Sequence, residues 1–418
     1  MKKTIHPTCS KFIFRLFTFI ALAMIPAGLM AQTPEADLQD LRVDVVYLAS
    51  DLLKGRETGT PGEDLAAQYI ATRFEEEGLT PKGTKGWFQP FDFEYKANPH
   101  AESGEPRTGK NVIGYLDNGA EYTVVIGAHY DHLGMGGSGS LFPGEAIHNG
   151  ADDNASGVAA MIYLAKKLKN NPRAKHNNYL FIAFSGEELG LFGSKYFTGH
   201  PTIDLKKVNY MINMDMVGRL NEGKVLAING AGTSPVWKEA LARINVANIT
   251  PKTSDSGIGP SDHTSFYLED IPVLHFFTGQ HTDYHKPSDD SELVNYEGIY
   301  QVAHFILQLI EDLDGSGKLA FTKTKDEQQR QGAAFKVTLG VMPDYVYDGE
   351  GMRIDAVIDG RPAEKGGLKK GDIIIKIGAQ PVKDIYDYME GLAQYKKGDK
   401  AKVRVRRGDE IKEFEVKF

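Results

Sequence analysis

The chain has 418 residues, 41 % of them hydrophobic and 25 % charged, which excludes a disordered or fibrous protein and leaves room for two or three folded domains. The formal net charge is −8 and no long basic run occurs, so we predict neither a nucleic-acid partner nor a polybasic membrane patch.

Residues 1–31 have the layout of a secretory signal peptide. Basic residues precede an apolar stretch at 16–30, which is followed by Ala31 and a polar segment. This stretch is shorter than the roughly 20 residues of a membrane span, and an uncleaved signal anchor stays open as the alternative. Cleavage near Ala31 would remove Cys9, the only cysteine. Export without disulfides fits a bacterial periplasm or cell surface.

Apolar strands and helices alternate through the middle of the chain. The predicted helices cover residues 61–78, 156–169, a segment from 188, 235–244 and 296–313, and the predicted strands cover 122–131, 179–185, 210–218, 224–230 and 271–276. This alternation predicts an α/β domain with a largely parallel sheet covered by helices on both faces. Functional sites of such sheets form at the carboxyl ends of the strands.

The pattern changes after residue 313. Residues 314–332 are polar, charged and contain Gly and Ser, and we interpret them as a linker. Residues 333–418 hold short β-rich segments, the last of which reads as a hairpin around Arg407, Gly408 and Asp409. The sequence therefore predicts a small, separate, β-rich domain at the end of the chain.

Five segments carry candidate metal ligands, each at or just past the end of a predicted strand. They are "GAHYDH" (127–132), "NGADDNASG" (149–157), "SGEELG" (185–190), "NMDMVG" (213–218) and "DYHKPSDD" (283–290). Each alone has an ordinary reading, such as a hydrogen-bonded histidine or acids in the first turn of a helix. Together, so many acids at the ends of buried strands would repel one another unless cations neutralised them. Histidine with carboxylates is a ligand set that suits zinc.

The order and spacing of these motifs resemble the M28 family of metallopeptidases, which are di-zinc aminopeptidases and carboxypeptidases of phosphorylase/hydrolase-like fold. The upstream stretch "YLASDLLKGRETGTPGEDLAAQYI" also matches, so the resemblance covers roughly residues 41–313. It implies a peptidase domain at 32–313, built on a mixed, mostly parallel sheet flanked by helices.

The resemblance also implies a role for each ligand. His129 would bind one Zn²⁺ ion and His285 a second, with Asp153 bridging the two. Asp215 would complete the His129 site, and Glu188 would complete the His285 site.

Three further residues receive roles from the same resemblance. Glu187 would take the proton of the attacking water and pass it to the leaving amine. Tyr284 would donate a hydrogen bond to the developing oxyanion. Asp131 would accept the second imidazole N–H of His129 and so fix its tautomer.

The stretch "GRPAEKGGLKKGDIIIKIGAQPV" (360–382) resembles the core of a bacterial PDZ domain. Residues 337–343, "VTLGVMP", stand where such domains have their carboxylate-binding loop. An exposed strand edge beside backbone N–H groups can bind a peptide or a protein C-terminus. A purely structural or docking role is the alternative.

These observations predict an exported, di-zinc exopeptidase, an aminopeptidase that hydrolyses N-terminal peptide bonds of peptide substrates with an activated water. Three alternatives stay open. They are a carboxypeptidase, a glutaminyl-cyclase-like acyltransferase with one zinc, and a non-catalytic protein that holds peptides.

Overall fold

The computed structural model describes Met1 and residues 34–96, 103–137, 139–324, 337–344, 347, 349–357, 360–383 and 385–418. Apart from Met1, the predicted signal peptide lies outside these residues, as does the predicted linker from residue 325 on. Within the described ranges, no helix is both long enough and apolar enough to cross a membrane.

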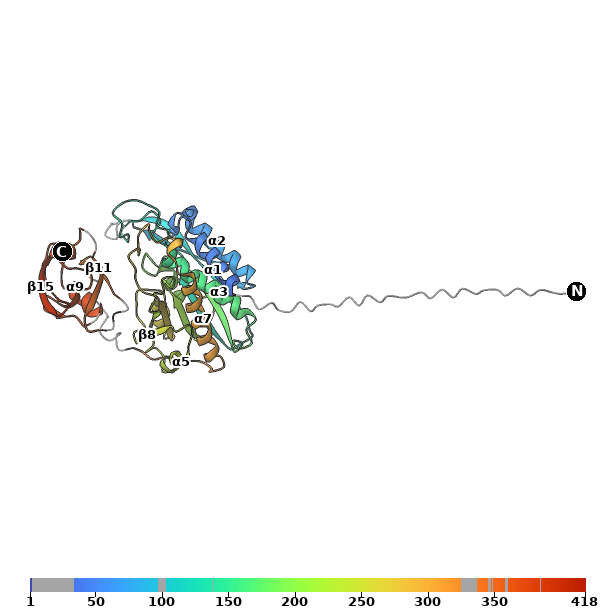
Figure 1. The fold of residues 1–418 in the computed structure, drawn as a ribbon. Coiled ribbons are helices and arrows are strands. Elements are labelled where there is room, and N and C mark those ends of the chain that lie inside the picture. Colours follow the sequence, from blue (N-terminus) through green and yellow to red (C-terminus); the bar gives the residue numbers. More distant parts are fainter. Residues whose placement is uncertain are drawn as a thin grey trace.

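A nine-stranded mixed sheet forms the centre of the larger body (Figure 1). Its strands are β1 (Thr80–Pro81), β2 (Phe88–Tyr95), β3 (Glu105–Leu116), β4 (Tyr122–His129), β5 (Asn177–Phe184), β6 (Val208–Met214), β7 (Val225–Asn229), β8 (Thr250–Ser254) and β9 (Val273–Phe277). The order is β1-β3-β5-β4-β6-β9-β7-β8, with β2 also paired to β3. The four central strands, β5-β4-β6-β9, are parallel, whereas β3 and β7 join them antiparallel.

Helices cover both faces of this sheet. They are α1 (Pro34–Leu48), α2 (Pro61–Glu76), α3 (Gly157–Lys169), α4 (Phe192–Gly199), α5 (Trp237–Arg243), α6 (His263–Tyr267) and α7 (Tyr296–Leu313), with single turns η1 (Asp51–Arg56), η2 (Ala151–Ser156), η3 (Leu205–Lys207) and η4 (Ser291–Leu293). α1, α2, α3 and α7 share one apolar core on one face, and α4 and α6 belong to a second core on the other. The predicted mixed sheet flanked by helices is confirmed.

Strand β4 shows why the central strands read as continuous apolar runs. Successive side chains of a strand point to opposite faces, so Val124 and Ile126 enter the first core while Val125 enters the second. Both faces of β4 are therefore buried, as is usual for a parallel strand.

The segment after β5 differs from its prediction. The sequence predicts a helix from Glu188, whereas α4 begins only at Phe192. Glu187 to Gly190 form a turn closed by the Gly190 N–H to the Glu187 carbonyl at 2.8 Å, and Leu191 has a left-handed φ of 65°. The two glutamates are thus not first-turn acids of a helix.

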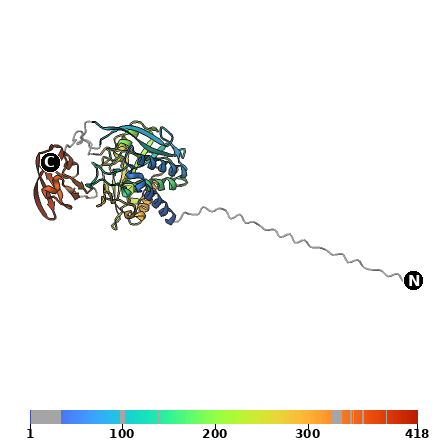
Figure 2. The same cartoon turned by 90° about the horizontal axis from the view of Figure 1, so that it is seen from above.

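A second sheet of six strands has its own core and forms a separate lobe in both views (Figures 1 and 2). It contains β10 (Val341–Pro343), β11 (Met352–Val357), β12 (Ile373–Ile377), β13 (Gln380–Pro381), β14 (Lys400–Arg407) and β15 (Glu410–Lys417), with helices α8 (Pro362–Gly366) and α9 (Ile385–Ala393). The predicted terminal hairpin is β14 and β15, which pair antiparallel around Gly408 and Asp409. The small domain at the chain's end is therefore β-rich, as predicted.

The first residues of the predicted linker pack against the larger body. Leu319 is 5 % exposed and belongs to the main core, and its N–H donates to Asn209 Oδ1 at 2.8 Å. The hydroxyls of Thr324 and Tyr267 lie 2.9 Å apart. Residues up to Thr324 thus help to complete the larger domain, although the exact domain bounds stay a prediction.

Replacing Leu319 by alanine tests this packing. Because the side chain is buried, Leu319→Ala should lower the free energy of unfolding by about 2–3 kcal/mol. Both tryptophans, Trp87 and Trp237, lie in the larger domain, so urea unfolding followed by their fluorescence reports on it. The control, Leu268→Ala, removes a side chain that is 57 % exposed and should change little. Equal effects of the two substitutions would show that the segment does not pack there.

Candidate metal centre

The sheet brings the candidate ligands to one edge. His129 is the last residue of β4, Asp215 directly follows β6, and Glu188 lies in the turn after β5. Because these strands are parallel neighbours, their carboxyl ends meet at the same edge. Asp153 lies in turn η2 and His285 in the loop after β9, and both reach the same place.

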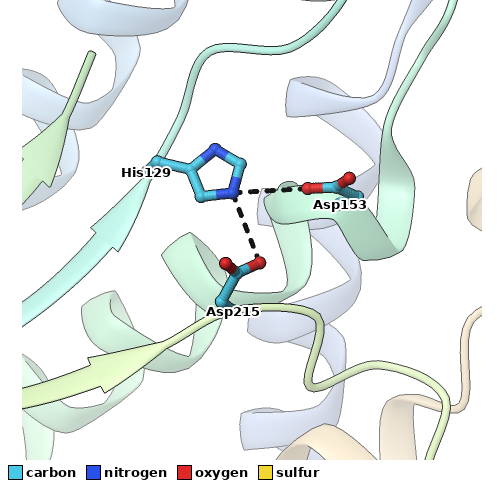
Figure 3. A group of neighbouring side chains, drawn as sticks. All are labelled: His129, Asp153 and Asp215. Atoms are coloured by element: carbon cyan, nitrogen blue, oxygen red, sulfur yellow. Dashed lines mark hydrogen bonds and ion pairs between the residues drawn. The ribbon is translucent and has the colours of Figure 1, made fainter. Parts of the chain in front are cut away.

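The first group of ligands consists of His129, Asp153 and Asp215 (Figure 3). The Nε2 atom of His129 lies 3.3 Å from Asp153 Oδ1 and 3.3 Å from Asp215 Oδ1. All three side chains converge on one point in front of the strand ends.

The second group uses the other oxygen of the same aspartate. The Nε2 atom of His285 lies 3.2 Å from Asp153 Oδ2 and 3.2 Å from Glu188 Oε2. The remaining oxygen of Glu188 lies 2.7 Å from Nδ1 of His132. Asp153 therefore faces one histidine with each oxygen, which is the geometry of a bridging carboxylate.

These distances fit zinc. Zinc binds His nitrogen and carboxylate oxygen at roughly 2.0–2.1 Å, so two ligands of a tetrahedral ion lie about 3.3 Å apart. The observed separations in both groups are 3.2 and 3.3 Å. The donor set and its spacing thus fit two divalent ions that share Asp153.

The charges of the two groups also favour binding of cations. Burial opposes ionisation of Asp153, but hydrogen bonds from His129 and His285 and the charge of His132 hold its pKa well below the usual range. Burial likewise disfavours charge on His285, yet Glu188 and Asp153 raise its pKa well above the usual value. The acids therefore stabilise positive charge at these positions, as a cation site requires.

The main chain that carries Asp153 is held by a second aspartate. Asp289 Oδ2 accepts the N–H groups of Asp152 and Asp153, each at 3.0 Å. Arg219 lies 3.4 Å from the other oxygen of Asp289. These contacts fix the turn that presents the shared carboxylate.

A buried arginine ties this turn to β4. Arg56 is 1 % exposed and donates to the main-chain carbonyls of Tyr130 at 2.7 Å, Asn149 at 2.6 Å and Gly150 at 3.0 Å. Burial lowers the pKa of Arg56 to about 10, while Asp153 and Asp131 counteract the effect. The guanidinium thus remains a cation beneath the acids at neutral pH.

Each ligating imidazole also has a partner for its other nitrogen. His285 Nδ1 lies 2.8 Å from the carbonyl of Gly139. His129 Nδ1 lies 3.2 Å from the main-chain carbonyl of Asp131, whereas the Asp131 carboxylate is at 3.7 Å. The nearer acceptor for His129 is thus the carbonyl and not the predicted carboxylate. Both contacts leave Nε2 facing the acids.

The carboxylate of Asp131 has other partners. Asp131 Oδ1 accepts the N–H of Glu187 at 3.1 Å, and Oδ2 accepts the hydroxyl of Thr58 at 3.1 Å. Asp131 therefore positions the main chain of Glu187 as well as lying near His129.

A pocket opens over the two groups; together with the solvent at its mouth it holds roughly 530 Å³ of space not filled by protein atoms. It is lined by the five candidate ligands together with Glu187, Tyr284, Met216, Asn229, Pro260, His275, Phe277 and Gln280. The ring of Tyr284 stacks on that of His285, with centroids 3.8 Å apart. Burial and the nearby carboxylates of Asp215 and Glu188 raise the pKa of Glu187 well above the usual value, although His129 opposes the effect.

The structure brings every residue of the predicted site to this pocket or next to it, while the individual roles stay predictions. Arg56, His132 and Gly139 have contacts at this site that were not predicted from the sequence. His132 lies within the motif "GAHYDH" and Arg56 within the upstream motif, so the sequence pattern could have indicated a role for both. The contact of Gly139 could not be predicted from the sequence, because it forms only when its loop packs against His285, which is distant in sequence.

Comparisons with known proteins identify the two domains. Residues 111–310 match the model of peptidase family M28, and residues 322–418 match that of the PDZ domain. The first match includes all five candidate ligands and Glu187. The chain therefore carries an M28 peptidase domain followed by a PDZ domain.

Curated relatives cover part of the chain. The aminopeptidase YwaD of Bacillus subtilis is 30 % identical over 194 residues, which are 44 % of this chain and 39 % of that protein. The alkaline phosphatase isozyme conversion protein of Escherichia coli is 31 % identical over 195 residues, 45 % of this chain and 53 % of that protein. The chain thus spans about half or less of the length of these relatives.

Solved structures agree with the fold. A zinc aminopeptidase from Bacillus subtilis has a TM-score of 0.52 at 18 % identity, covering 68 % of this chain and 95 % of its own. A glutaminyl cyclase from Porphyromonas gingivalis has a TM-score of 0.55 at 17 % identity, covering 66 % and 98 %. At these identities the likeness establishes the fold alone.

A further buried acid, Glu63, lies in the first turn of α2. Glu63 accepts the N–H of Gly59 at 2.7 Å, the hydroxyl of Tyr130 at 3.0 Å and the hydroxyl of Ser185. Burial raises the pKa of Glu63 to about 7, against the lowering effect of the hydrogen bonds from Ser185 and Gly59. Ser185 opens the turn that carries Glu187 and Glu188, so Glu63 supports that turn.

The raised pKa of Glu63 predicts a pH-dependent stability. The folded state favours protonated Glu63. The stabilisation that protonated Glu63 adds to the folded state is therefore complete below pH 4.5 and is lost as the pH rises through about 7. In Glu63→Gln this loss of stability should be absent. The difference in free energy of unfolding between variant and parent should therefore change by about 3 kcal/mol between pH 4.5 and about 7. Urea unfolding with chelator present, at several pH values, measures it.

The matched control is Glu222→Gln, at an exposed position. Its stability difference from the parent should stay constant over the same pH range. A constant difference for Glu63→Gln as well would contradict the assignment of a raised pKa.

Proposed function

We propose that this protein is an exported, zinc-dependent aminopeptidase that removes N-terminal residues from peptides. The observation that carries the proposal is Asp153, whose two oxygens face His129 on one side and His285 on the other. Glu187 lines the same pocket. The M28 domain match and the relatives named as aminopeptidases support this function.

The proposal places two Zn²⁺ ions, one held by His129, Asp153 and Asp215 and one by His285, Asp153 and Glu188. Zinc held by these residues would polarise the scissile carbonyl and would make a water molecule a stronger nucleophile at neutral pH. His132, at 2.7 Å from Glu188, and Gly139, at 2.8 Å from His285, orient the ligands of the second ion.

Glu187 moves the proton in this proposal. It lies in the pocket beside the ligands, and its N–H is held by Asp131 at 3.1 Å. There its carboxylate can accept a proton from the attacking water as a general base. It takes a proton from water as the new C–O bond forms, and gives that proton to the amine as the C–N bond breaks. Tyr284 donates a hydrogen bond to the oxyanion.

The charges of the pocket favour an aminopeptidase over a carboxypeptidase. Among the described residues that line the pocket there is no lysine or arginine, so a substrate's C-terminal carboxylate would find no cationic side chain. Glu187 and Asp215 offer negative charge to a free α-amine. Recognition of an ammonium group by these acids is the simplest match of charges.

The proposal extends to location and partners. The features of residues 1–31 support export to a bacterial periplasm or cell surface. The C-terminal PDZ domain is proposed to bind a peptide or a protein C-terminus at a strand edge, which would bring peptides or a partner protein to the peptidase domain.

Replacing Glu187 separates proton transfer from metal binding. Glu187→Gln keeps the size of the side chain but removes its basicity, so kcat for an aminoacyl reporter should fall by about 10²–10⁴-fold. The zinc content should stay at two ions per chain, because Glu187 is not a ligand in the proposal. Steady-state kinetics and elemental analysis on the same sample measure both.

Glu222→Gln, at an exposed position, is the control and should leave both quantities unchanged. Loss of zinc in the Glu187 variant would mean that the base and a ligand have been exchanged. Release of ammonia and a pyroglutamyl peptide from a glutamine-terminated peptide, without amide hydrolysis, would favour the glutaminyl-cyclase alternative.

A further inference from the structure

A row of polar side chains crosses the sheet beside the metal centre. The register pairs Asn213 of β6 with His275 of β9, His275 with Asn229 of β7, and Asn229 with Ser254 of β8. Directly paired residues of neighbouring strands point to the same face. Four polar residues thus stand in one line within a sheet whose central strands are otherwise mainly apolar.

The hydrogen bonds along this row fix the proton of His275. The hydroxyl of Ser254 donates to Asn229 Oδ1 at 2.7 Å, so the amide nitrogen of Asn229 faces His275 Nδ1 at 3.2 Å. An amide nitrogen only donates, and Nδ1 must therefore accept. Burial lowers the pKa of His275 to about 4, so the imidazole is neutral and carries its proton on Nε2.

The Nε2–H of His275 has no hydrogen-bond partner among the described residues, although the side chain is 4 % exposed. The ring stacks on His263, with centroids 4.6 Å apart and planes 9° from parallel. An N–H lies in the plane of its ring, so the stacked neighbour does not accept it. The unused donor belongs to a residue that lines the pocket.

The same pocket holds an unused acceptor. Gln280 lines it, and the buried Oε1 of Gln280 has no hydrogen-bond partner among the described residues. Met216 and Phe277 supply apolar surface in the same pocket. Because buried polar groups are normally paired, a donor and an acceptor left open in one pocket indicate a ligand with the complementary pair.

We propose that this pocket binds the side chain of an N-terminal glutamine or asparagine, whose carboxamide oxygen accepts from His275 and whose amide nitrogen donates to Gln280. The proposal rests on the aminopeptidase function above and specifies its substrate class. Asn229 and Ser254 are positioning residues, since they act only by fixing the tautomer of His275.

Other side chains fit less well. A carboxylate would face the Gln280 oxygen and the acids of the metal centre without any lysine or arginine among the described lining residues. An apolar side chain would leave both polar groups desolvated and unpaired, which a binding site penalises strongly. A carboxamide offers an acceptor and a donor on neighbouring atoms of one small planar group.

The test compares substrates whose N-terminal side chains are similar in size. Reporters with N-terminal glutamine and methionine form one pair, and asparagine and leucine form the other. We expect kcat/KM to favour the carboxamide of each pair at least about tenfold in the zinc-loaded full chain. Calorimetric titration with free glutamine and methionine should show the same preference in binding, without turnover.

Two substitutions probe the two contacts. Gln280→Met removes the acceptor with little change in size, and His275→Phe removes the donor while keeping a stacked ring. Each should lower the glutamine-to-methionine ratio about tenfold or more, both in kcat/KM and in binding. Gln301→Met is the matched control, because the buried Oε1 of Gln301 also has no hydrogen-bond partner among the described residues, whereas Gln301 lies on α7 and does not line the pocket. It should leave the ratio unchanged.

The outcomes distinguish the two proposals. Faster release of methionine and leucine, with ratios unaffected by Gln280→Met, would overturn the carboxamide pocket and leave the aminopeptidase function standing. Preferred binding of glutamine with formation of a pyroglutamyl peptide would support the pocket and overturn the aminopeptidase function. No turnover and no preference in binding would overturn both.

Discussion

The candidate site depends on one shared carboxylate. Asp153 is 3 % exposed, and its two oxygens lie 3.3 Å from His129 Nε2 and 3.2 Å from His285 Nε2. A buried carboxylate at the meeting point of two histidines and two further acids requires positive charge close to both oxygens. The surrounding structure can be understood as the means of placing this one group between two cation positions and keeping it there.

Two buried residues perform that placement. The carboxylate of Asp289 accepts the main-chain N–H groups of Asp152 and Asp153. Arg56 donates to the carbonyls of Asn149 and Gly150, which directly precede this turn. Arg56 also donates to Tyr130, which lies between His129 and Asp131, so a single guanidinium joins the turn to the end of β4. Its fixed fork of donors suits main-chain carbonyls that converge from separate segments. The same charge partly offsets that of the acids above it.

The sequence predicts the part of the site that depends on strand ends. His129, Glu188 and Asp215 each follow an apolar run, and parallel strands bring such ends together, so their proximity follows from the pattern. Strands β2, β3 and β8 were not predicted, because β8 is mostly exposed and polar and the other two join the sheet at its margin. The row of polar residues from Asn213 to Ser254 could also not be predicted, because it depends on how four strands that are distant in sequence are aligned in the sheet. Contacts made by main-chain carbonyls, such as that of Gly139 with His285, cannot be predicted from residue types, because every residue has a main-chain carbonyl.

The most direct test of this account is the anomalous X-ray scattering of crystals grown from zinc-loaded protein, together with the zinc content of the same sample. The account predicts two zinc peaks per chain, one beside each oxygen of Asp153, with His129 and Asp215 at one and His285 and Glu188 at the other. A single peak, or a pair of peaks that does not share Asp153, would contradict it.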